Sequence, residues 1–240
     1  MKILAIETSC DETAAAVVED GTKILSNVVA SSTAMHEKYG GIVPEVAARE
    51  QLKCIIPVMC EALEPLESPE TLHATRANEA KHQTALGEVI KRHIDAIAVT
   101  VGPGLIGSLL VGVETAKTIA FATGKPIIPV NHVLAHMYAN FVHLQPTTYN
   151  LQPIQYPAIS LVVSGGHTEL YLMKSVKDLT WLGGTLDDAA GECFDKTARL
   201  LGFGHGGGLA IERAALKFKV QSSKFKVQNK TSKTNDGRII

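Results

Sequence analysis

KILAIETSCDETAAAVV, residues 2–18, is the stretch that decides the fold. It joins an apolar run at residues 2–6 to a second apolar run at residues 14–18 through the polar stretch ETSCDET at residues 7–13. Two short apolar runs on either side of a polar turn predict a pair of antiparallel strands. We therefore expect a β-hairpin whose polar turn is large enough to receive a phosphate group.

The same pattern returns at residues 158–173, AISLVVSGGHTELYLM. Strands are expected at residues 158–163 and 169–173, with the glycine turn SGGHT at residues 164–168 between them. Two such hairpins predict an α/β fold of two duplicated lobes, with a ligand in the cleft between the lobes. This arrangement resembles the ribonuclease H-like lobes of the actin, hexokinase and Hsp70 superfamily, and we expect the second lobe to be incomplete.

Periodicity and turn residues predict the remaining elements. Further strands are expected at residues 24–30, 94–101 and 125–130, helices at residues 44–63, 108–123 and 187–201, and a loop with a surface helix at residues 65–91. The expected inward positions are Val46, Ala47, Leu52, Ile55, Ile56 and Met59 in the first of these helices and Ala190, Phe194, Ala198 and Leu201 in the last.

The elements group into three parts. We expect an N-terminal actin-like lobe at residues 1–130, a partial second lobe at residues 131–216 and a basic tail at residues 217–240. The tail repeats KFKVQ at residues 217–221 and 224–228 and carries a charge of +6, whereas the remainder holds 16 basic and 23 acidic residues. Such a low-complexity segment predicts poor order, although its charge would also suit an arm that binds nucleic acid.

The bulk composition, 45% apolar with few aromatics, is that of a soluble globular protein. No apolar stretch is long and uninterrupted enough to span a bilayer, so we expect no membrane association. The N-terminus lacks the small-residue cleavage site of a secretory signal. The four cysteines form no CxxC pair, which predicts reduced thiols in a cytoplasmic protein.

The candidate chemistry lies in two short motifs. His132 and His136 in NHVLAH can share one helix face and hold a metal, although a His-x3-His pair can also be a packed or surface pair. Val133 occupies the place where a zinc protease of the His-Glu-x-x-His type needs glutamate. The glycine turn offers backbone N–H groups to a phosphate, and alone it is equally consistent with a plain hairpin turn.

Six motifs, taken in order, resemble the TsaD family of tRNA threonylcarbamoyladenosine transferases, once called glycoproteases. These are ETSCDET at residues 7–13, HEKYGGIVPE at 36–45, VGPGL at 101–105, NHVLAH at 131–136, VVSGGHT at 162–168 and DDAAGECFDK at 187–196. Six ordered motifs are far more specific than one glycine pattern. The resemblance implies transfer of the threonylcarbamoyl group from threonylcarbamoyl-AMP to the adenosine 3′ of the anticodon in tRNAs that read ANN codons.

The resemblance also assigns residues. Asp11 and Glu12 match carboxylates important for activity, with a role as general base or as organiser of water or metal. His132 and His136 match metal ligands, with iron(II) as the favoured ion and zinc as the alternative. The implied contacts to the adenylate are Val162, Val163, Ser164, Gly165, Gly166, Asp195, Gly208 and Glu212. The implied partners are tRNA and the TsaB-like and TsaE-like accessory subunits of the bacterial transfer complex.

The chain departs from the family pattern at several points. The family continues for on the order of a hundred residues more, a length that holds a third metal ligand. Gln51 stands where a histidine is often seen. Two other functions therefore stay open. One is a non-catalytic partner subunit of the modification complex, which the retained histidines disfavour, and the other is a small-molecule kinase, in which those histidines have no role.

Overall fold

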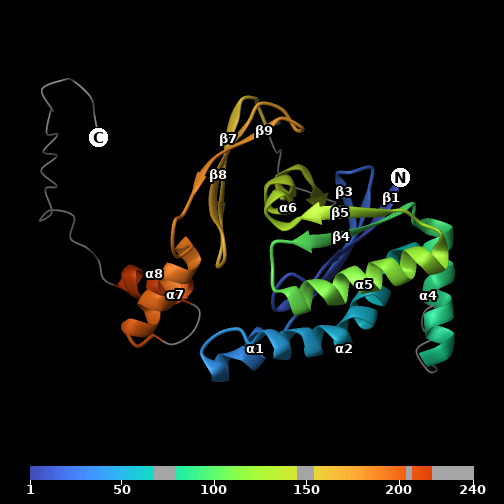
Figure 1. The fold of residues 1–240 in the computed structure, drawn as a ribbon, viewed down its shortest axis with the longest axis horizontal. Coiled ribbons are helices and arrows are strands. Elements are labelled where there is room, and N and C mark those ends of the chain that lie inside the picture. The colour runs from blue at the N-terminus through green and yellow to red at the C-terminus, as the bar shows by residue number, and fades with distance from the viewer. Residues whose placement is uncertain (68–78, 145–153, 204–206, 218–240) are drawn as a thin grey trace, which may run out of the picture. The chain divides into compact units, whose positions relative to one another are not determined.

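A six-stranded mixed sheet forms the centre of the N-terminal part of the chain (Figure 1). Its strands, in spatial order, are β5 (Ile127–Asn131), β4 (Ala96–Gly102), β1 (Lys2–Glu7), β2 (Glu12–Glu19), β3 (Lys23–Ser31) and β6 (His143–Leu144). β1, β2 and β3 run antiparallel, β4 pairs parallel with β1 and β5 with β4, and β6 pairs parallel with β3. The first hairpin predicted from the sequence is thus confirmed.

The computed structural model describes residues 1–67, 79–144, 154–203 and 207–217. The chain divides into two compact units, residues 1–190 and residues 191–240. Most of the predicted tail, residues 218–240, lies outside the described residues. The lobe boundary expected near residue 130 stays a prediction, because both sheets belong to the first unit.

Three long helices accompany the large sheet: α2 (Pro44–Leu63) and α5 (Ile106–Thr123) pack on its strands, and α4 (Glu79–His93) packs against α5. α2 and α5 lie along one face of the sheet (Figure 1). Aliphatic side chains of β1, β2 and β4 meet those of the helices in one core, and its largest fully buried members include Leu4, Val17, Met59, Ile90 and Ile97. Burial of these side chains is the main stabilising term for the layer pair.

The structure corrects two expectations for these helices. Leu52 is 63% exposed, whereas its neighbour Gln51 is buried, because the inward stripe runs through positions 47, 51, 55, 58, 59 and 62. α4 is more than a surface helix, since Leu86, Val89 and Ile90 join the core. The polar composition of residues 65–91 led to the expectation of a surface helix, although these three apolar residues are buried.

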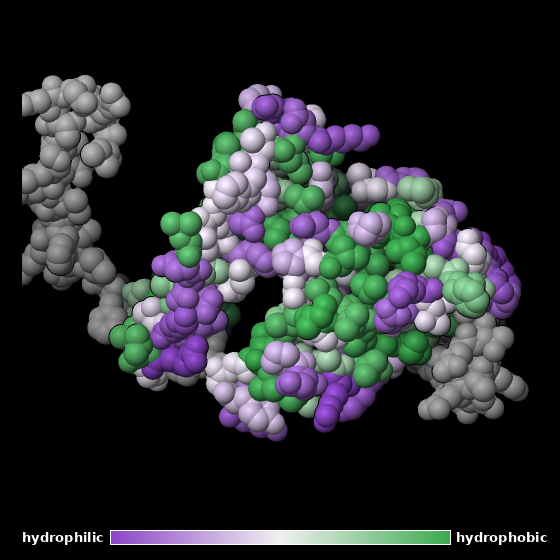
Figure 2. Space-filling view, viewed as in Figure 1, coloured by the Kyte–Doolittle hydropathy of each residue, from purple (hydrophilic) through white to green (hydrophobic). Residues whose placement is uncertain are grey.

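By length and composition, α5 is the one described helix that could cross a membrane, which corrects the expectation that no stretch qualifies. It packs on β4 and α2 and carries the ion pair of Lys117 with Glu114, so its apolar residues are those of a helix on a sheet. Its outer side still exposes Ile106, Leu110 and Phe121. Figure 2 shows apolar side chains gathered over this helix and its neighbours.

A second sheet holds three antiparallel strands, β7 (Ala158–Val163), β8 (Thr168–Met173) and β9 (Leu179–Gly184). β7 and β8 form the second predicted hairpin, while β9 and the short β6 were not expected. The sheet repeats the antiparallel order of β1, β2 and β3 without the parallel strands that follow them in the first sheet. The fold is therefore the expected ribonuclease H-like α/β fold, with one complete lobe and part of another.

The short helix α6 (His132–Tyr138) follows β5 and packs against β7. Val133 and Met137 of α6 form a small buried cluster with Val162 of β7. The opposite face of β7 leaves Ile159, Leu161 and Val163 exposed. Within the described part of the chain, β7 is thus covered by α6 on one side and exposed on the other.

The second unit contains α7 (Ala190–Leu200), which begins at the boundary, and α8 (Gly207–Lys217). Of the four side chains of α7 and its end predicted to point inward, Ala198 is buried, but Phe194 and Leu201 are 48% and 58% exposed. The prediction is wrong for these two residues. Apolar periodicity marks the face of a helix that can pack, but among the described residues of this unit no element covers the larger apolar side chains of that face.

Candidate functional site

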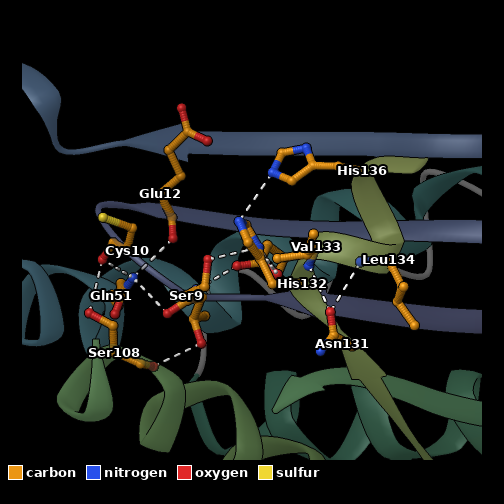
Figure 3. Close-up of polar contacts among 12 residues, drawn as sticks. Ser9, Cys10, Glu12, Gln51, Ser108, Asn131, His132, Val133, Leu134 and His136 are labelled. Carbon is orange, nitrogen blue, oxygen red and sulfur yellow. Dashed lines mark hydrogen bonds and ion pairs between the residues drawn. The ribbon is translucent and has the colours of Figure 1, made fainter. Parts of the chain in front are cut away.

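The helix α6 brings the two candidate metal ligands together. Asn131 caps it, and its Oδ1 accepts hydrogen bonds from the N–H groups of Val133 (2.9 Å) and Leu134 (3.1 Å). Residues four apart lie on the same face of a helix. The Nε2 atoms of His132 and His136 consequently lie 3.1 Å apart (Figure 3).

This separation fits two ligands of one metal ion. Nitrogens about 2.0–2.1 Å from a shared ion, at tetrahedral or octahedral angles, lie about 2.8–3.4 Å from each other. On its other side, the His132 ring places Nδ1 3.2 Å from Ser9 Oγ and 3.6 Å from Glu7 Oε2. Such outer partners fix the ring orientation of a metal-binding histidine. Across the described part of the chain, no group of three or more His, Cys, Asp or Glu side chains could hold a metal, so the pair leaves coordination positions open.

The local electrostatics suit a neutral His136 imidazole beside an ionised Glu7 carboxylate. Burial lowers the pKa of His136, and the neighbouring His132 and His167 add to this effect. Burial acts to raise the pKa of Glu7, but hydrogen bonds from His132, Ser9 and Thr100 outweigh it and bring the pKa to about 2. Metal ligation needs deprotonated imidazoles, which is the form that burial favours at His136.

The glycine turn between β7 and β8 lies next to the histidine pair. The ring centroids of His167 and His132 are 5.5 Å apart. Ser164 closes this turn, since its N–H donates to His167 O at 2.8 Å and its Oγ accepts from the His167 N–H at 3.0 Å. The Ser164 N–H, which the sequence assigned to a phosphate, is thus occupied. The exposed Gly165 and Gly166 carry the N–H groups that face no partner among the described residues.

Two valines precede this turn. The side chain of Val162 is buried in the cluster with Val133 and Met137, so only its backbone is left to meet a ligand. The Val163 side chain is 53% exposed on the opposite face of β7. Alternation along the strand assigns the two valines to different faces.

The first hairpin loop carries Asp11, and Glu12 directly after it begins β2. Thr33 Oγ1 donates to Asp11 Oδ2 at 2.9 Å, and Ser32 donates to Asp11 O from both Oγ (2.7 Å) and N (3.1 Å). The Glu12 side chain is exposed, and in Figure 3 its carboxylate extends away from Gln51. Because Ser9 of the same loop contacts His132, the structure connects these carboxylates to the histidine pair through one short segment.

Sequence reasoning missed the residues that hold this loop. Gln51 of α2 donates from Nε2 to the carbonyls of Cys10 (3.0 Å) and Glu12 (2.9 Å), and Ser108 of α5 donates from Oγ to the Cys10 carbonyl at 2.9 Å (Figure 3). A usable signal was present, since Gln51 lies four residues from both Ala47 and Ile55 on the apolar stripe of α2. A polar residue on such a stripe indicates a specific buried partner.

The other predicted nucleotide contacts, Asp195, Gly208 and Glu212, lie in the second unit. Asp195 Oδ1 accepts a hydrogen bond from the Gly207 N–H at 3.0 Å. A Cβ at Gly207 would lie 2.5 Å from that oxygen, whereas a Cβ at Gly208 would meet nothing within 4 Å. Gly207, rather than Gly208, is therefore the glycine that the close approach of α7 and α8 requires.

A family model described as TsaD, tRNA N6-adenosine threonylcarbamoyltransferase, matches residues 23–236. The chain belongs to the TsaD family. The tRNA N6-adenosine threonylcarbamoyltransferase of Thermomicrobium roseum is 52% identical over 215 residues, which are 90% of this chain and 53% of the relative. That of Clostridium botulinum (strain Hall) is 46% identical over 236 residues, which are 98% of this chain and 61% of the relative.

The chain thus spans between half and two thirds of the length of these TsaD relatives. Among solved structures, YeaZ from Pseudomonas aeruginosa matches with a TM-score of 0.39 at 15% identity, over 76% of this chain and 66% of that one.

Proposed function

We propose that this chain provides the metal-binding and adenylate-binding part of a tRNA N6-adenosine threonylcarbamoyltransferase. The reaction transfers the threonylcarbamoyl group from threonylcarbamoyl-AMP to N6 of the adenosine 3′ of the anticodon in tRNAs that read ANN codons. The supporting observation is the 3.1 Å approach of His132 and His136 Nε2, with the His167 ring of the glycine turn at 5.5 Å from His132.

The chemistry of the substrates suits these groups. The adenosine amine attacks the activated carbonyl, a C–N bond forms, the bond from the carbonyl carbon to the phosphate oxygen breaks, and AMP leaves with the release of one proton. Gly165 and Gly166 would donate N–H groups to the phosphate. Asp11 and Glu12 would accept the proton or order the water that does.

A divalent ion held by His132 and His136 would neutralise phosphate charge and polarise the carbonyl. Iron(II) is the favoured ion and zinc the alternative. Two imidazoles leave positions open for substrate and for a further protein ligand. The relatives' additional length, which this chain does not span, is the place where we expect that ligand. Expected partners are tRNA and the TsaB-like and TsaE-like subunits, and the expected location is the cytoplasm.

A transfer assay tests this proposal. It supplies preformed threonylcarbamoyl-AMP, tRNA and the accessory subunits, and it compares this chain with a version extended by the C-terminal segment of a 52% identical relative. We expect modified adenosine from the extended protein and little or none from the chain alone. Absence of product with the extended protein, while the relative itself is active, would refute the transferase proposal.

A second candidate is a non-catalytic partner subunit of the same complex. It is favoured by the chain spanning about half of its relatives and by the lack of a three-ligand metal group among the described residues. This function predicts stable binding to a TsaB-like subunit without bound metal. One equivalent of iron or zinc in the purified chain would favour the enzyme instead.

A further inference from the structure

The loop of residues 8–11 between β1 and β2 turns several of its backbone carbonyls toward helices. Gln51 Nε2 donates to the carbonyls of Glu12 at 2.9 Å and Cys10 at 3.0 Å, and it lies 3.4 Å from that of Thr8. An amide nitrogen carries two hydrogens, so the two shorter contacts are full hydrogen bonds and the third is a weaker, shared one.

The orientation of this amide is fixed by the loop. Gln51 is 1% exposed, and its Oε1 has no hydrogen-bond partner among the described residues. Turning the amide over would place Oε1 against three carbonyl oxygens, which is repulsive. An unpartnered buried acceptor is unfavourable, and an apolar residue would continue the stripe of Ala47 and Ile55. Packing alone therefore does not explain a glutamine at position 51. The need of the loop carbonyls for hydrogen-bond donors does explain it.

A second helix holds the same loop from the start of α5. The Leu105 N–H donates to the Ser9 carbonyl at 2.7 Å, and Ser108 Oγ donates to the Cys10 carbonyl at 2.9 Å. Two of the residues whose carbonyls accept these hydrogen bonds, Ser9 and Glu12, also contribute side chains to the candidate site. Ser9 Oγ lies 3.2 Å from His132 Nδ1, and Glu12 carries one of the two candidate carboxylates.

We propose that Gln51 is a positioning residue of the transfer reaction: its amide fixes the loop so that Asp11, Glu12 and the Ser9 contact to His132 keep constant directions. The proposal rests on the proposed function, since it gives Asp11 and Glu12 a part in the transfer. Gln51 touches the loop backbone and not the substrate. Its loss should loosen the loop without removing any group that binds the adenylate.

The thiol of Cys10 reports on the loop without any assay of transfer. Burial and the neighbouring Asp11 raise its pKa to about 12, so it should react slowly with iodoacetamide. In Gln51→Met, which keeps the shape and removes both donors, we expect Cys10 to be alkylated at least about ten-fold faster because the loop opens locally. Cys193, exposed on α7, should keep its rate and serves as the internal reference.

Two further variants separate positioning from general destabilisation. Met59→Ala leaves a cavity in the core on the same helix and should lower the melting temperature without accelerating Cys10 alkylation well below that temperature. Gln51→His keeps an N–H donor and should hold Cys10 within about two-fold of the parent rate. Parental protection of Cys10 in Gln51→Met, or equal acceleration in Met59→Ala or Gln51→His, would overturn the proposal.

If Gln51→Met does not fold, Gln51→Asn takes its place, because the shorter amide cannot reach the carbonyls. The same acceleration of Cys10 alkylation is expected. In the extended protein, Gln51→Met should lower kcat about ten-fold or more with little change in the KM for threonylcarbamoyl-AMP. A change in KM alone would contradict positioning. If the extended protein shows no transfer, the proposed function fails, and Cys10 alkylation still decides whether Gln51 fixes the loop.

Discussion

Ser9 Oγ and His132 Nδ1 lie 3.2 Å apart, although 123 residues separate them in the chain. The contact joins the first hairpin loop to the helix that carries the histidine pair. It leaves His132 Nε2 to face His136 Nε2, which is the arrangement that metal ligation needs.

Ser9→Ala is expected to weaken metal binding, because the His132 ring loses a partner that fixes its orientation. Loss of such an outer partner costs about 10–100-fold in affinity. Titration calorimetry measures the affinity for Zn²⁺. His136→Ala, which removes one of the two candidate ligands, serves as the control that should not bind. Thr115→Ala, which removes a hydroxyl bonded within α5, should bind Zn²⁺ like the parent. Equal affinities for Ser9→Ala and the parent would show that the hydroxyl does not orient the ring.

Asn131→Ala should lower stability by about 1 kcal/mol, because the N–H groups of Val133 and Leu134 lose their capping oxygen. Asn131→Asp keeps an acceptor in the same place and should cost far less. Denaturant unfolding followed by circular dichroism gives both values. A parental midpoint for Asn131→Ala would mean that the short helix α6 is held by its packing on β7 alone.

Gly207→Ala should destabilise the second unit, since the new Cβ would lie 2.5 Å from Asp195 Oδ1 and 2.6 Å from Asp195 N. Gly208→Ala provides the matched control in the same helix, because its Cβ meets open space, and alanine in a helix gains about 0.5–1 kcal/mol over glycine. Hydrogen exchange of the α8 amides should therefore be faster in the first variant and unchanged or slower in the second. The reverse order would exclude the close approach of Gly207 to Asp195.

Cys10 and Cys193 should differ in alkylation as a function of pH. With a pKa raised to about 12, Cys10 holds about one thiolate in ten thousand at pH 8. Its rate should rise about ten-fold per pH unit between pH 8 and pH 10 while Cys193 reacts first throughout. Mass spectrometry of peptides sampled over time resolves the two sites. A Cys10 rate that levels off below pH 10 would contradict the raised pKa.

Local patterns in the sequence were enough for much of the fold. Both hairpins, the long helices α2 and α5 and the parallel strands β4 and β5 follow from periodicity and turn residues, and the structure confirms them. Predictions were poorest where a partner element decides the outcome. Leu52 and Phe194 carry apolar side chains on helices, yet they are exposed, because burial depends on which element packs against that face.

The site divides in the same way. The shared face of His132 and His136 follows from their spacing of four, since 3.6 residues per turn brings such side chains together in any helix. The turn at residues 164–168, with the backbone N–H groups of its two glycines, was also predicted from the sequence. These are properties of short segments, and the amino-acid order alone determines them.

Only the tertiary structure decided which distant segments share the site. The meeting of Ser9 with His132, the place of His167 beside the histidine pair, and the hold of Gln51 and Ser108 on the first loop all depend on how strands and helices pack. The tertiary structure also shows that the Val162 side chain is buried and that the Ser164 N–H donates to His167 O within its own turn. Such outcomes are set by strand register and helix packing, because these decide which groups far apart in the chain come within hydrogen-bond distance.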